Sequence, residues 1–350
     1  MGQELFYGYH AQNMPGIAER LDMTDRKILH YLDRNGRLST TAIAKTLKLS
    51  REVVDYRIRQ LTKRGILTGF TTLVDVKRLG LLKHLVYLRL QNFTKEREDA
   101  LVAAFKKNKS IVWVASCGGG WDLGLLVSSK DLEDFASAFN EITRACGGNL
   151  NDYIILNEIT EDFAGRGLLV EGFVPKETPL DREGVAFQRA FKARKREQAV
   201  VSLTPQDRKV LNALIADPLI PLSRLAKEVG SSVPTVRKSA SELIKNGVIF
   251  GFMPMVSFSK LGYQWHMTFL RFNEYSQQDE RRLIEYFYQH PNILWYIKTV
   301  GPWNMQLSVF AKDATHYREI LNSLRKEFGA VIKDYDSIMI FNQHKYLHAI

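Results

Sequence analysis

The segment LDMTDRKILHYL, residues 21–32, decides the organisation of this chain, because a second version of it, LTPQDRKVLNAL, occupies residues 203–214. The two segments lie 182 positions apart, and the same offset relates Trp121 to Trp303. A constant offset over this distance indicates a duplicated unit, which is much longer than the ~20–50 residues of a solenoid repeat. The sequence therefore predicts two large copies, copy one from residue 21 and copy two from residue 203, each able to enclose its own core.

Composition and charge are those of a folded, basic protein. Of the 350 residues, 45% are hydrophobic and 25% are charged, and the formal net charge is +11. These fractions are typical of globular domains, and at ~100–200 residues per domain the length predicts two to four domains. The positive charge favours polyanionic partners, although a generally basic surface is the plainer explanation.

The cysteine content and the hydropathy of the chain indicate where in the cell the protein is expected and whether it carries a metal or cofactor motif. Two cysteines, Cys117 and Cys146, are too few for a secreted disulfide framework, which predicts a reducing interior. Residues 1–20 lack the apolar core of a signal peptide, and no apolar run reaches the ~20 residues that span a bilayer. No CxxC pair or HExxH helix occurs. We therefore expect a cytoplasmic protein with no membrane-spanning segment, no metal site and no cofactor.

The first part of each copy predicts three short helices and a strand region. The candidate N-caps in copy one are Thr24, Ser39 and Ser50. The third helix has one buried stripe, formed by Val54, Ile58 and Leu61. Residues 66–74 follow with a strand pattern that predicts a strand pair or wing. Three helices with a tight turn before the third, followed by a wing, form a winged helix-turn-helix, and copy two repeats the pattern.

The second part of each copy alternates between strand and helix patterns. In copy one the strand patterns fall at residues 84–91, 111–117, 121–128 and 151–159, and the helical patterns at 95–106 and 131–145. The order β-α-β-β-α-β is the ferredoxin-like pattern, and copy two repeats it between residues 264 and 341. The predicted fold class is α+β, with two copies of a winged helix-turn-helix followed by a ferredoxin-like βαββαβ domain.

These patterns divide the chain into six segments. We predict an N-terminal extension (1–20), winged helix-turn-helix domains (21–80 and 203–262), ferredoxin-like domains (81–163 and 263–350) and a linker (164–202). The linker contains a charged helical pattern at residues 181–198 that ends in a basic cluster. This segment is interpreted as a solvated linker, with an auxiliary arm that contacts phosphate as the alternative.

A set of short motifs in copy one has a recognisable family pattern. The motifs are Leu-Asp-x-x-Asp at 21–25, Ala-Lys at 44–45, Leu-Ser at 49–50, Gly-Ile at 65–66, Gly-Phe at 69–70 and Gly-x-x-Asp at 119–122. In combination they resemble the Lrp/AsnC family of transcription regulators, over nearly the whole chain apart from the N-terminal extension and the linker. The resemblance implies a DNA-binding domain followed by an effector-binding and oligomerisation domain. Typical members carry one copy per chain and dimerise, so two fused copies imply a pseudo-dimer within one polypeptide.

Copy two departs from this pattern at three positions. Ser239 stands where copy one has Arg57, Asn304 where it has Asp122, and Thr204 where it has Asp22. These differences suggest that the two copies have divided their functions.

Contacts with DNA are expected on the face of each third helix that lies opposite its buried stripe. The candidate DNA-binding residues are Ser50, Arg51, Tyr56, Arg57, Arg59 and Lys63 in copy one, and Ser232, Thr235, Arg237, Lys238 and Lys245 in copy two. Arg51 follows the helix cap, where recognition helices meet base edges and arginine can bond guanine. Arg57, Arg59 and Lys63 are expected at phosphates. The plainer alternative is a solvated basic face, and the second helix could be a weaker reader or a structural remnant.

The turn CGGGWD at residues 117–122 contains more glycine than a hairpin requires. Glycine permits close approach to the backbone, so a small amino acid could place its carboxylate on exposed N–H groups there. The resemblance also implies an amino-acid effector near this turn, between protomers. The candidate effector residues are Gly119, Gly120, Trp121 and Asp122. The alternatives are a tight hairpin, and a Trp121 that fills the core or closes the site.

Together these features predict a sequence-specific regulator of transcription that binds double-stranded DNA and has no catalytic residues. A small amino-acid effector and a homo-oligomer through the ferredoxin-like domains are the further partners considered. Two other classes stay open. One is a protein-binding module acting on the transcription machinery, and the other is an enzyme like the sirohaem decarboxylases, which are similar in fold and would need converging basic and histidine residues. If both third helices bind DNA, their half-sites should lie about one helical turn, or a multiple, apart.

Overall fold

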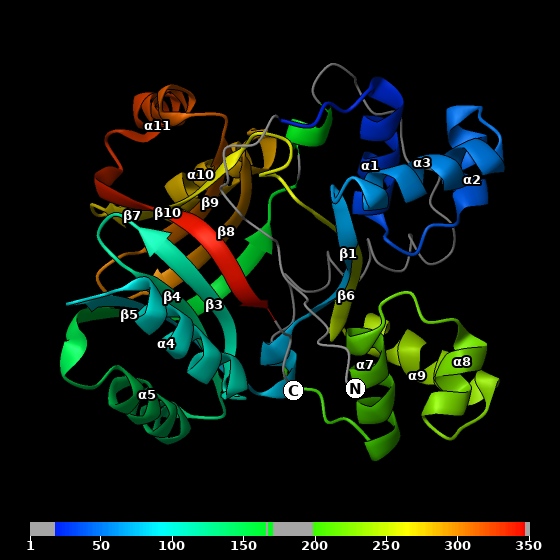
Figure 1. The fold of residues 1–350 in the computed structure, drawn as a ribbon, viewed down its shortest axis with the longest axis horizontal. Helices are drawn as coiled ribbons and strands as arrows, with labels where there is room; N and C mark the ends of the chain where they lie inside the picture. The colour runs from blue at the N-terminus through cyan, green and yellow to red at the C-terminus, as the bar shows by residue number, and fades with distance from the viewer. Residues whose placement is uncertain (1–17, 166, 171–198, 347–350) are drawn as a thin grey trace. The chain divides into compact units, whose positions relative to one another are not determined.

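The computed structural model describes residues 18–165, 167–170 and 199–346, and these residues divide into two compact units (Figure 1). Residues 21–81 and 199–256 form the helix-turn-helix unit, and residues 18–20, 82–165, 167–170 and 257–346 form the sheet unit. Corresponding parts of the two copies are thus grouped together. The helix expected at residues 181–198 and most of the N-terminal extension lie outside the described residues, and the six-segment division stays a prediction.

Copy one contributes three helices to the helix-turn-helix unit: α1 (Met23–Arg34), α2 (Thr40–Leu47) and α3 (Arg51–Lys63). Ser39 and Ser50 cap α2 and α3 as expected, each accepting a hydrogen bond from a backbone N–H three residues on. The prediction for α1 was wrong, because Asp22 and not Thr24 is its cap. The carboxylate of Asp22 accepts from the Asp25 N–H at 2.8 Å, so the helix begins earlier than expected.

Copy two repeats this arrangement with α7 (Pro205–Ala216), α8 (Leu222–Glu228) and α9 (Val233–Lys245). Thr204 and Asp207 form a capping box at the start of α7, and Ser232 caps α9. The apolar stripes of the three helices meet in a core that includes Val210, Leu225 and Val236. Each copy therefore has the predicted helix-turn-helix core.

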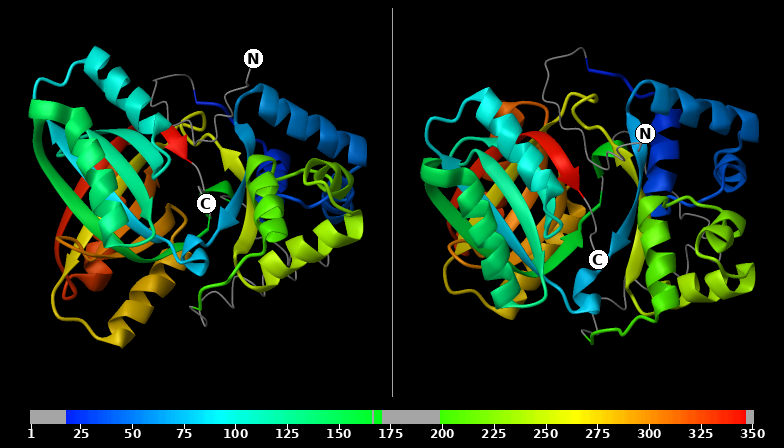
Figure 2. Two further views of the ribbon diagram at one scale, coloured as in Figure 1. Left: turned by 90° about the horizontal axis from the view of Figure 1, so that it is seen from below. Right: turned by 60° about the horizontal axis from the view of Figure 1, so that its bottom comes forward.

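One strand from each copy joins the two helical bundles. β1 (Leu67–Val74) pairs antiparallel with β6 (Ile249–Val256), so the strand pair forms between the copies and not as a hairpin within either copy. β1 contacts α7 and β6 contacts α1. The Thr72 hydroxyl donates a hydrogen bond to the Leu214 carbonyl, and Arg37 donates to the carbonyl of Pro218 at 2.8 Å. The two helix-turn-helix domains therefore share contacts across the strand pair. Within this unit, Figure 2 shows α1–α3 and α7–α9 on one side of β1 and β6.

The described part of the sheet unit contains one closed antiparallel sheet, to which each copy contributes four strands. Copy one supplies β2 (Leu82–Leu90), β3 (Ile111–Gly118), β4 (Leu123–Ser129) and β5 (Leu150–Phe163), and copy two supplies β7 (Gln264–Phe272), β8 (Ile293–Val300), β9 (Met305–Ala311) and β10 (Ile332–Tyr346). The strand order is β10-β3-β4-β2-β5-β8-β9-β7. The last strand of each copy therefore pairs with the other copy, through β5–β8 and β10–β3.

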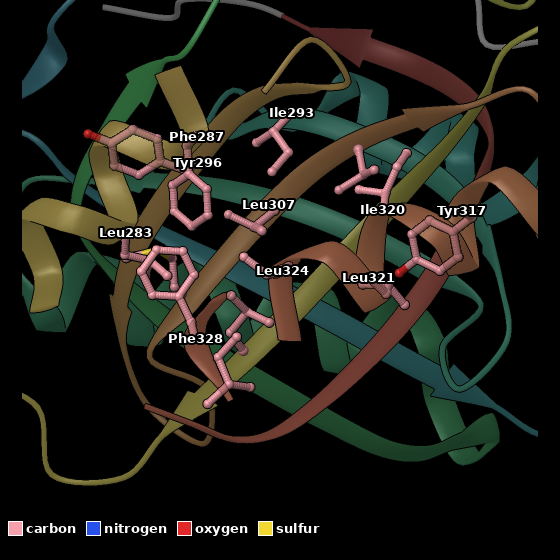
Figure 3. Packing of buried hydrophobic residues seen from close by; sticks show 14 of the residues in the cluster. Leu283, Phe287, Ile293, Tyr296, Leu307, Tyr317, Ile320, Leu321, Leu324 and Phe328 are labelled. Carbon is pink, nitrogen blue, oxygen red and sulfur yellow. The ribbon is translucent and has the colours of Figure 1, made fainter. Parts of the chain in front are cut away.

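Two helices from each copy cover the sheet: α4 (Lys95–Lys107), α5 (Leu132–Cys146), α10 (Gln277–Gln289) and α11 (Ala314–Phe328). Figure 3 shows the core of copy two, where Phe287, Leu307 and Leu324 pack between helices and strands. Inside the closed sheet, Tyr87 meets Phe269 of the other copy edge to face, with ring centroids 5.0 Å apart. Short 3-10 turns occur at Val76–Leu79, Gly147–Asn149 and Gly167–Val170. Within the described ranges, no helix is both long and apolar enough to cross a membrane.

Candidate nucleic-acid interface and glycine turns

The exposed face of α3 brings together four of the predicted DNA-binding residues. Arg51 has a 65% exposed side chain, and its Nε lies 3.4 Å from a carboxylate oxygen of Asp55, one turn along the helix. Tyr56 is 57% exposed. Arg59 and Lys63 are also exposed, and neither makes an ion pair with any described residue. These side chains are accessible to a macromolecular partner.

Arg57 has a different environment from its neighbours on α3. One terminal nitrogen of its guanidinium donates to Asp22 at 2.6 Å and to Asp25 at 2.9 Å, so it ties α3 to α1. Burial raises the pKa of Asp22, but hydrogen bonds from Arg57 and the Asp25 N–H, with the charge of Arg57, outweigh this effect and hold the pKa below its usual value. The observed role of Arg57 is structural, and its predicted contact with phosphate stays a prediction.

The same joint in copy two is made without an arginine. Ser239, at the position of Arg57, donates a hydrogen bond from its hydroxyl to Asp207, the counterpart of Asp25. The other carboxylate oxygen of Asp207 accepts from the Thr204 hydroxyl at 2.7 Å. The substitutions noted in the sequence therefore replace an ion pair between the two helices by a hydrogen bond from a hydroxyl to a carboxylate, and the two helices stay linked.

The exposed face of α9 carries the predicted residues of copy two. Thr235, Arg237, Lys238 and Lys245 are exposed, and none of the three basic side chains makes an ion pair with the residues that the structure describes. The Ser232 hydroxyl caps the helix and lies 2.8 Å from the Thr235 hydroxyl. Ser232, like Ser50 in copy one, thus has an observed role at the helix start.

The glycine turn of copy one joins β3 to β4. Asp122 uses a carboxylate oxygen to accept the Leu90 N–H at 2.7 Å, which fixes the turn against β2. Trp121 is 6% exposed, and the guanidinium of Arg89 lies 4.9 Å above its ring. Arg89 also donates to the Gly120 carbonyl at 2.7 Å. Trp121 and Asp122 therefore have packing and hydrogen-bonding roles in this turn.

The last strand of copy two closes over this turn. Gly119 has φ +115°, which side chains rarely adopt, and a Cβ there would lie 3.4 Å from the Ser337 carbonyl of β10. A Cβ at Gly120 would lie 3.5 Å from Arg89 and 3.9 Å from a carboxylate oxygen of Asp336. Gly120 thus lies beside a basic and an acidic side chain that come from different copies, and Gly119 lies beside the backbone of β10.

The turn of copy two has the same construction with different residues. Asn304 accepts the Phe272 N–H at 2.9 Å, as Asp122 does for Leu90. Arg271 donates to the Pro302 carbonyl at 3.0 Å and lies 4.8 Å above Trp303. Sequence reasoning missed Arg89 and Arg271, although their spacing of 182 residues, equal to that of the two tryptophans, was a usable signal.

Two histidines lie at equivalent positions of the sheet unit. Both ring nitrogens of His84 have partners, Asn157 at 2.7 Å and Ser129 at 3.0 Å. His266 stacks on Tyr317 with centroids 4.0 Å apart, and burial lowers its pKa to about 4. Both rings are part of the core. No group of three acidic, histidine or cysteine residues within the described ranges is arranged to hold a metal ion.

Comparisons with known protein families match both helix-turn-helix domains. Residues 21–62 match the AsnC-type helix-turn-helix domain, and residues 203–249 match a winged helix-turn-helix DNA-binding family. The two matches begin at equivalent positions of the two copies. Both copies are therefore DNA-binding domains of the helix-turn-helix class.

Relatives and a solved structure extend this result beyond the helices. The proline dehydrogenase transcriptional activator of Rhodobacter capsulatus is 31% identical over 127 residues, which span 36% of this chain and 82% of that protein. The transcriptional regulator AldR of Mycobacterium tuberculosis is 28% identical over 118 residues, 33% of this chain and 66% of that protein. The crystal structure of the siroheme decarboxylase NirDL matches 93% of both chains with a TM-score of 0.59 and 13% identity, which shows a shared fold. The chain is a DNA-binding regulator of transcription and belongs to the Lrp/AsnC family, with two copies of the family unit in one polypeptide.

Proposed function

We propose that this regulator binds a specific site on double-stranded DNA through α3 and α9 together. The observation that carries the proposal is that both helices expose basic side chains within one compact unit, where β1 and β6 join their domains. Arg51 contacts a guanine edge in the major groove. The phosphate contacts come from Arg59, Lys63, Arg237, Lys238 and Lys245. Repression by occlusion and activation by recruitment are both compatible with this mode of binding.

Salt dependence tests the proposed contacts directly. Five phosphate contacts give a slope of log affinity against log salt of about −4.5, at about −0.9 per contact. We expect the double variant Arg59→Ala/Lys63→Ala to reduce the slope by about 1.8. The matched control is Lys107→Ala/Lys109→Ala, which removes two exposed charges from the sheet unit. Equal slopes for wild type and the Arg59/Lys63 variant would refute the contacts.

We propose that a small amino acid regulates DNA binding as an effector, and that it binds at the glycine turn of copy one. Its carboxylate would bond the backbone N–H groups of Gly119 and Gly120, and its ammonium group would face Asp336. The proximity of Asp336 to Gly120 supports this orientation. An amino-acid panel should shift the DNA affinity of the wild type, and Asp336→Asn should abolish that shift while DNA binding without effector persists. A response that survives Asp336→Asn would place the effector elsewhere.

Self-association through the sheet unit is the remaining part of the proposal. The sheet unit has exposed apolar side chains, among them Leu132 at 67% and Tyr153 at 45% exposure, which suit a contact between chains. Sedimentation of the full chain over a range of concentrations measures the oligomeric state. A monomer at every concentration would contradict self-association, and Leu132→Glu tests which face is used.

One observation favours a second function, the likeness of the whole fold to a siroheme decarboxylase. That chemistry would require free basic and histidine groups between the ferredoxin-like domains. His84 and His266 are instead buried and stacked on aromatic rings. We therefore rank it second. An absorbance titration with sirohaem tests it. A spectral change that persists when another tetrapyrrole is added in excess would revive the enzymatic hypothesis.

A further inference from the structure

The third helices of the two copies, α3 and α9, carry opposite net charge in their first two turns. In the first two turns of α3 the exposed or half-exposed ionic groups are Arg51, Glu52 and Asp55, with a sum of −1 once Arg57 is committed to α1. The corresponding turns of α9 carry Arg237 and Lys238, with a sum of +2. Asp55 and Arg237 occupy equivalent positions, so the charge is reversed at one site on the helix.

The charges on α3 are engaged with one another or with the helix. Asp55 lies 3.4 Å from Nε of Arg51, and neither terminal nitrogen of that guanidinium has a hydrogen-bond partner among the described residues. A hydrogen bond from its own backbone N–H and one from the Ser50 hydroxyl lower the pKa of Glu52, so this exposed carboxylate is charged at neutral pH. A carboxylate facing DNA repels phosphate unless it accepts from a base amine such as that of cytosine. Binding by α3 therefore depends on the bases beneath it.

The charges on α9 are free. Arg237 and Lys238 make no ion pair with the described residues, and Pro234 occupies the position of Glu52. Free cations near the backbone bind phosphate irrespective of base sequence and release counterions as they do so. Binding by α9 therefore contributes affinity on any duplex.

We propose that α9 anchors the protein on DNA while α3 discriminates between sequences, with Asp55 as the residue that positions Arg51. The operator is accordingly two unequal half-sites, one strictly specified with a guanine opposite Arg51 and one permissive. This inference rests on the proposed function, since both helices must contact the duplex. In this division of roles α9 contributes the larger share of the affinity for DNA. The sequence suggested that this helix binds DNA more weakly than α3 or is a structural remnant.

The positioning role of Asp55 follows from the geometry of arginine. Bidentate recognition of guanine uses two N–H donors toward O6 and N7. The Asp55 carboxylate, 3.4 Å from Nε, attracts that side of the guanidinium and leaves the two terminal nitrogens to face the base. Asp55→Asn removes the charge and keeps the size of the side chain, so it should relax the choice of base at one position and strengthen binding to random duplex. Asp55→Glu should restore part of the selectivity.

The test uses the full chain and two duplexes, the best one selected from a random pool and a randomised one. Both are measured over a salt series. We expect Arg51→Ala to weaken the selected duplex by roughly 5- to 150-fold and to leave the random duplex nearly unchanged. Arg237→Ala/Lys238→Ala should weaken both duplexes equally and reduce the salt slope by about 1.8. The Lys107→Ala/Lys109→Ala variant serves as the charge-matched control.

The outcomes distinguish a failure of the division of roles between α3 and α9 from a failure of DNA binding itself. Selected sites with two equally specified halves, or a loss of selectivity with Arg237→Ala/Lys238→Ala, would overturn the division of roles and leave DNA binding intact. Affinity that does not respond to salt and is the same for both duplexes would overturn the proposed function itself. A melting temperature unchanged from wild type confirms that each of these surface variants is folded.

Discussion

The joint between α1 and α3 and the joint between α7 and α9 hold equivalent helices together by different chemistry. Copy one uses an arginine between two carboxylates, and copy two uses a serine hydroxyl on one carboxylate. Both solutions give the inner carboxylate, Asp25 or Asp207, a hydrogen-bond partner on the third helix. The exposed faces of the same helices have no such requirement, and there the charge has reversed between Asp55 and Arg237. The two copies therefore differ in charge at exposed positions of the third helix and agree in keeping a hydrogen bond between the first and third helices.

The largest expected effect is the loss of the ionic joint. Arg57→Ala leaves two carboxylates without their shared guanidinium. We expect the free energy of unfolding to fall by about 2–3 kcal/mol, less than the ~3–5 kcal/mol for breaking a fully buried pair, because Arg57 and Asp22 are partly exposed. Ser239→Ala should lower it by about 1.5 kcal/mol, since one hydrogen bond to an ionised carboxylate is lost. Denaturant unfolding of the full chain measures both values. Equal losses would show that the two joints do not differ in strength.

The double variant Asp22→Thr/Arg57→Ser sharpens the same comparison. It gives copy one the joint residues of copy two, since Asp25 already matches Asp207. We expect it to be more stable than Arg57→Ala, because a serine hydroxyl can bond the remaining carboxylate. A double variant no more stable than Arg57→Ala would mean that the hydrogen bond from serine to the carboxylate depends on other features of copy two.

An intermediate effect is expected at the glycine turns, which are also built from an acid in one copy and an amide in the other. Asp122→Asn keeps an acceptor for the Leu90 N–H, as Asn304 does for Phe272, and should change the free energy of unfolding by less than about 0.5 kcal/mol. Asp122→Ala leaves that N–H without a partner and should lower the same quantity by about 1–2 kcal/mol. If the Asn variant is as damaging as the Ala variant, the charge of Asp122 has a further role.

The smallest effect is the pH dependence of the ionic joint. The pKa of Asp22 is lowered in the folded state, so its contribution to stability is present above its unfolded pKa and is lost as pH falls through the folded value. The difference in unfolding free energy between wild type and Asp22→Asn should therefore shrink from pH 6 to pH 3. Because Asp22 has a 54% exposed side chain, we expect a change of less than about 1 kcal/mol. A difference that stays constant with pH would exclude Asp22 as its source.

Much of the fold could be predicted because its signals are local. The order of helices and strands, the caps Ser39 and Ser50, and the β-α-β-β-α-β alternation follow from spacing along the chain. The start of α1 could not be placed as well, because Asp22 and Thr24 are both good caps and only the path of the chain into the helix chooses between them. On the candidate interface, the exposed positions of Arg51 and Arg59 followed from the buried stripe of α3. The pairing of Arg57 with Asp22 and Asp25 did not, since these residues lie on different helices.

The duplication, the two helix-turn-helix cores and the composition of α3 and α9 can all be read from the amino-acid sequence. These features depend on periodicity, capping and charge within segments of a few turns. The pairing of β1 with β6 and the crossing of β5 and β10 to the other copy are visible only in the folded chain. The same holds for the ion pairs of Arg57 and for the absence of an ionic partner for Arg237 among the described residues. The physical reason is that alternation in a strand specifies which face is buried but not which edge it meets. In the same way, a charged residue shows its sign in the sequence, whereas its partner is set by packing between distant segments.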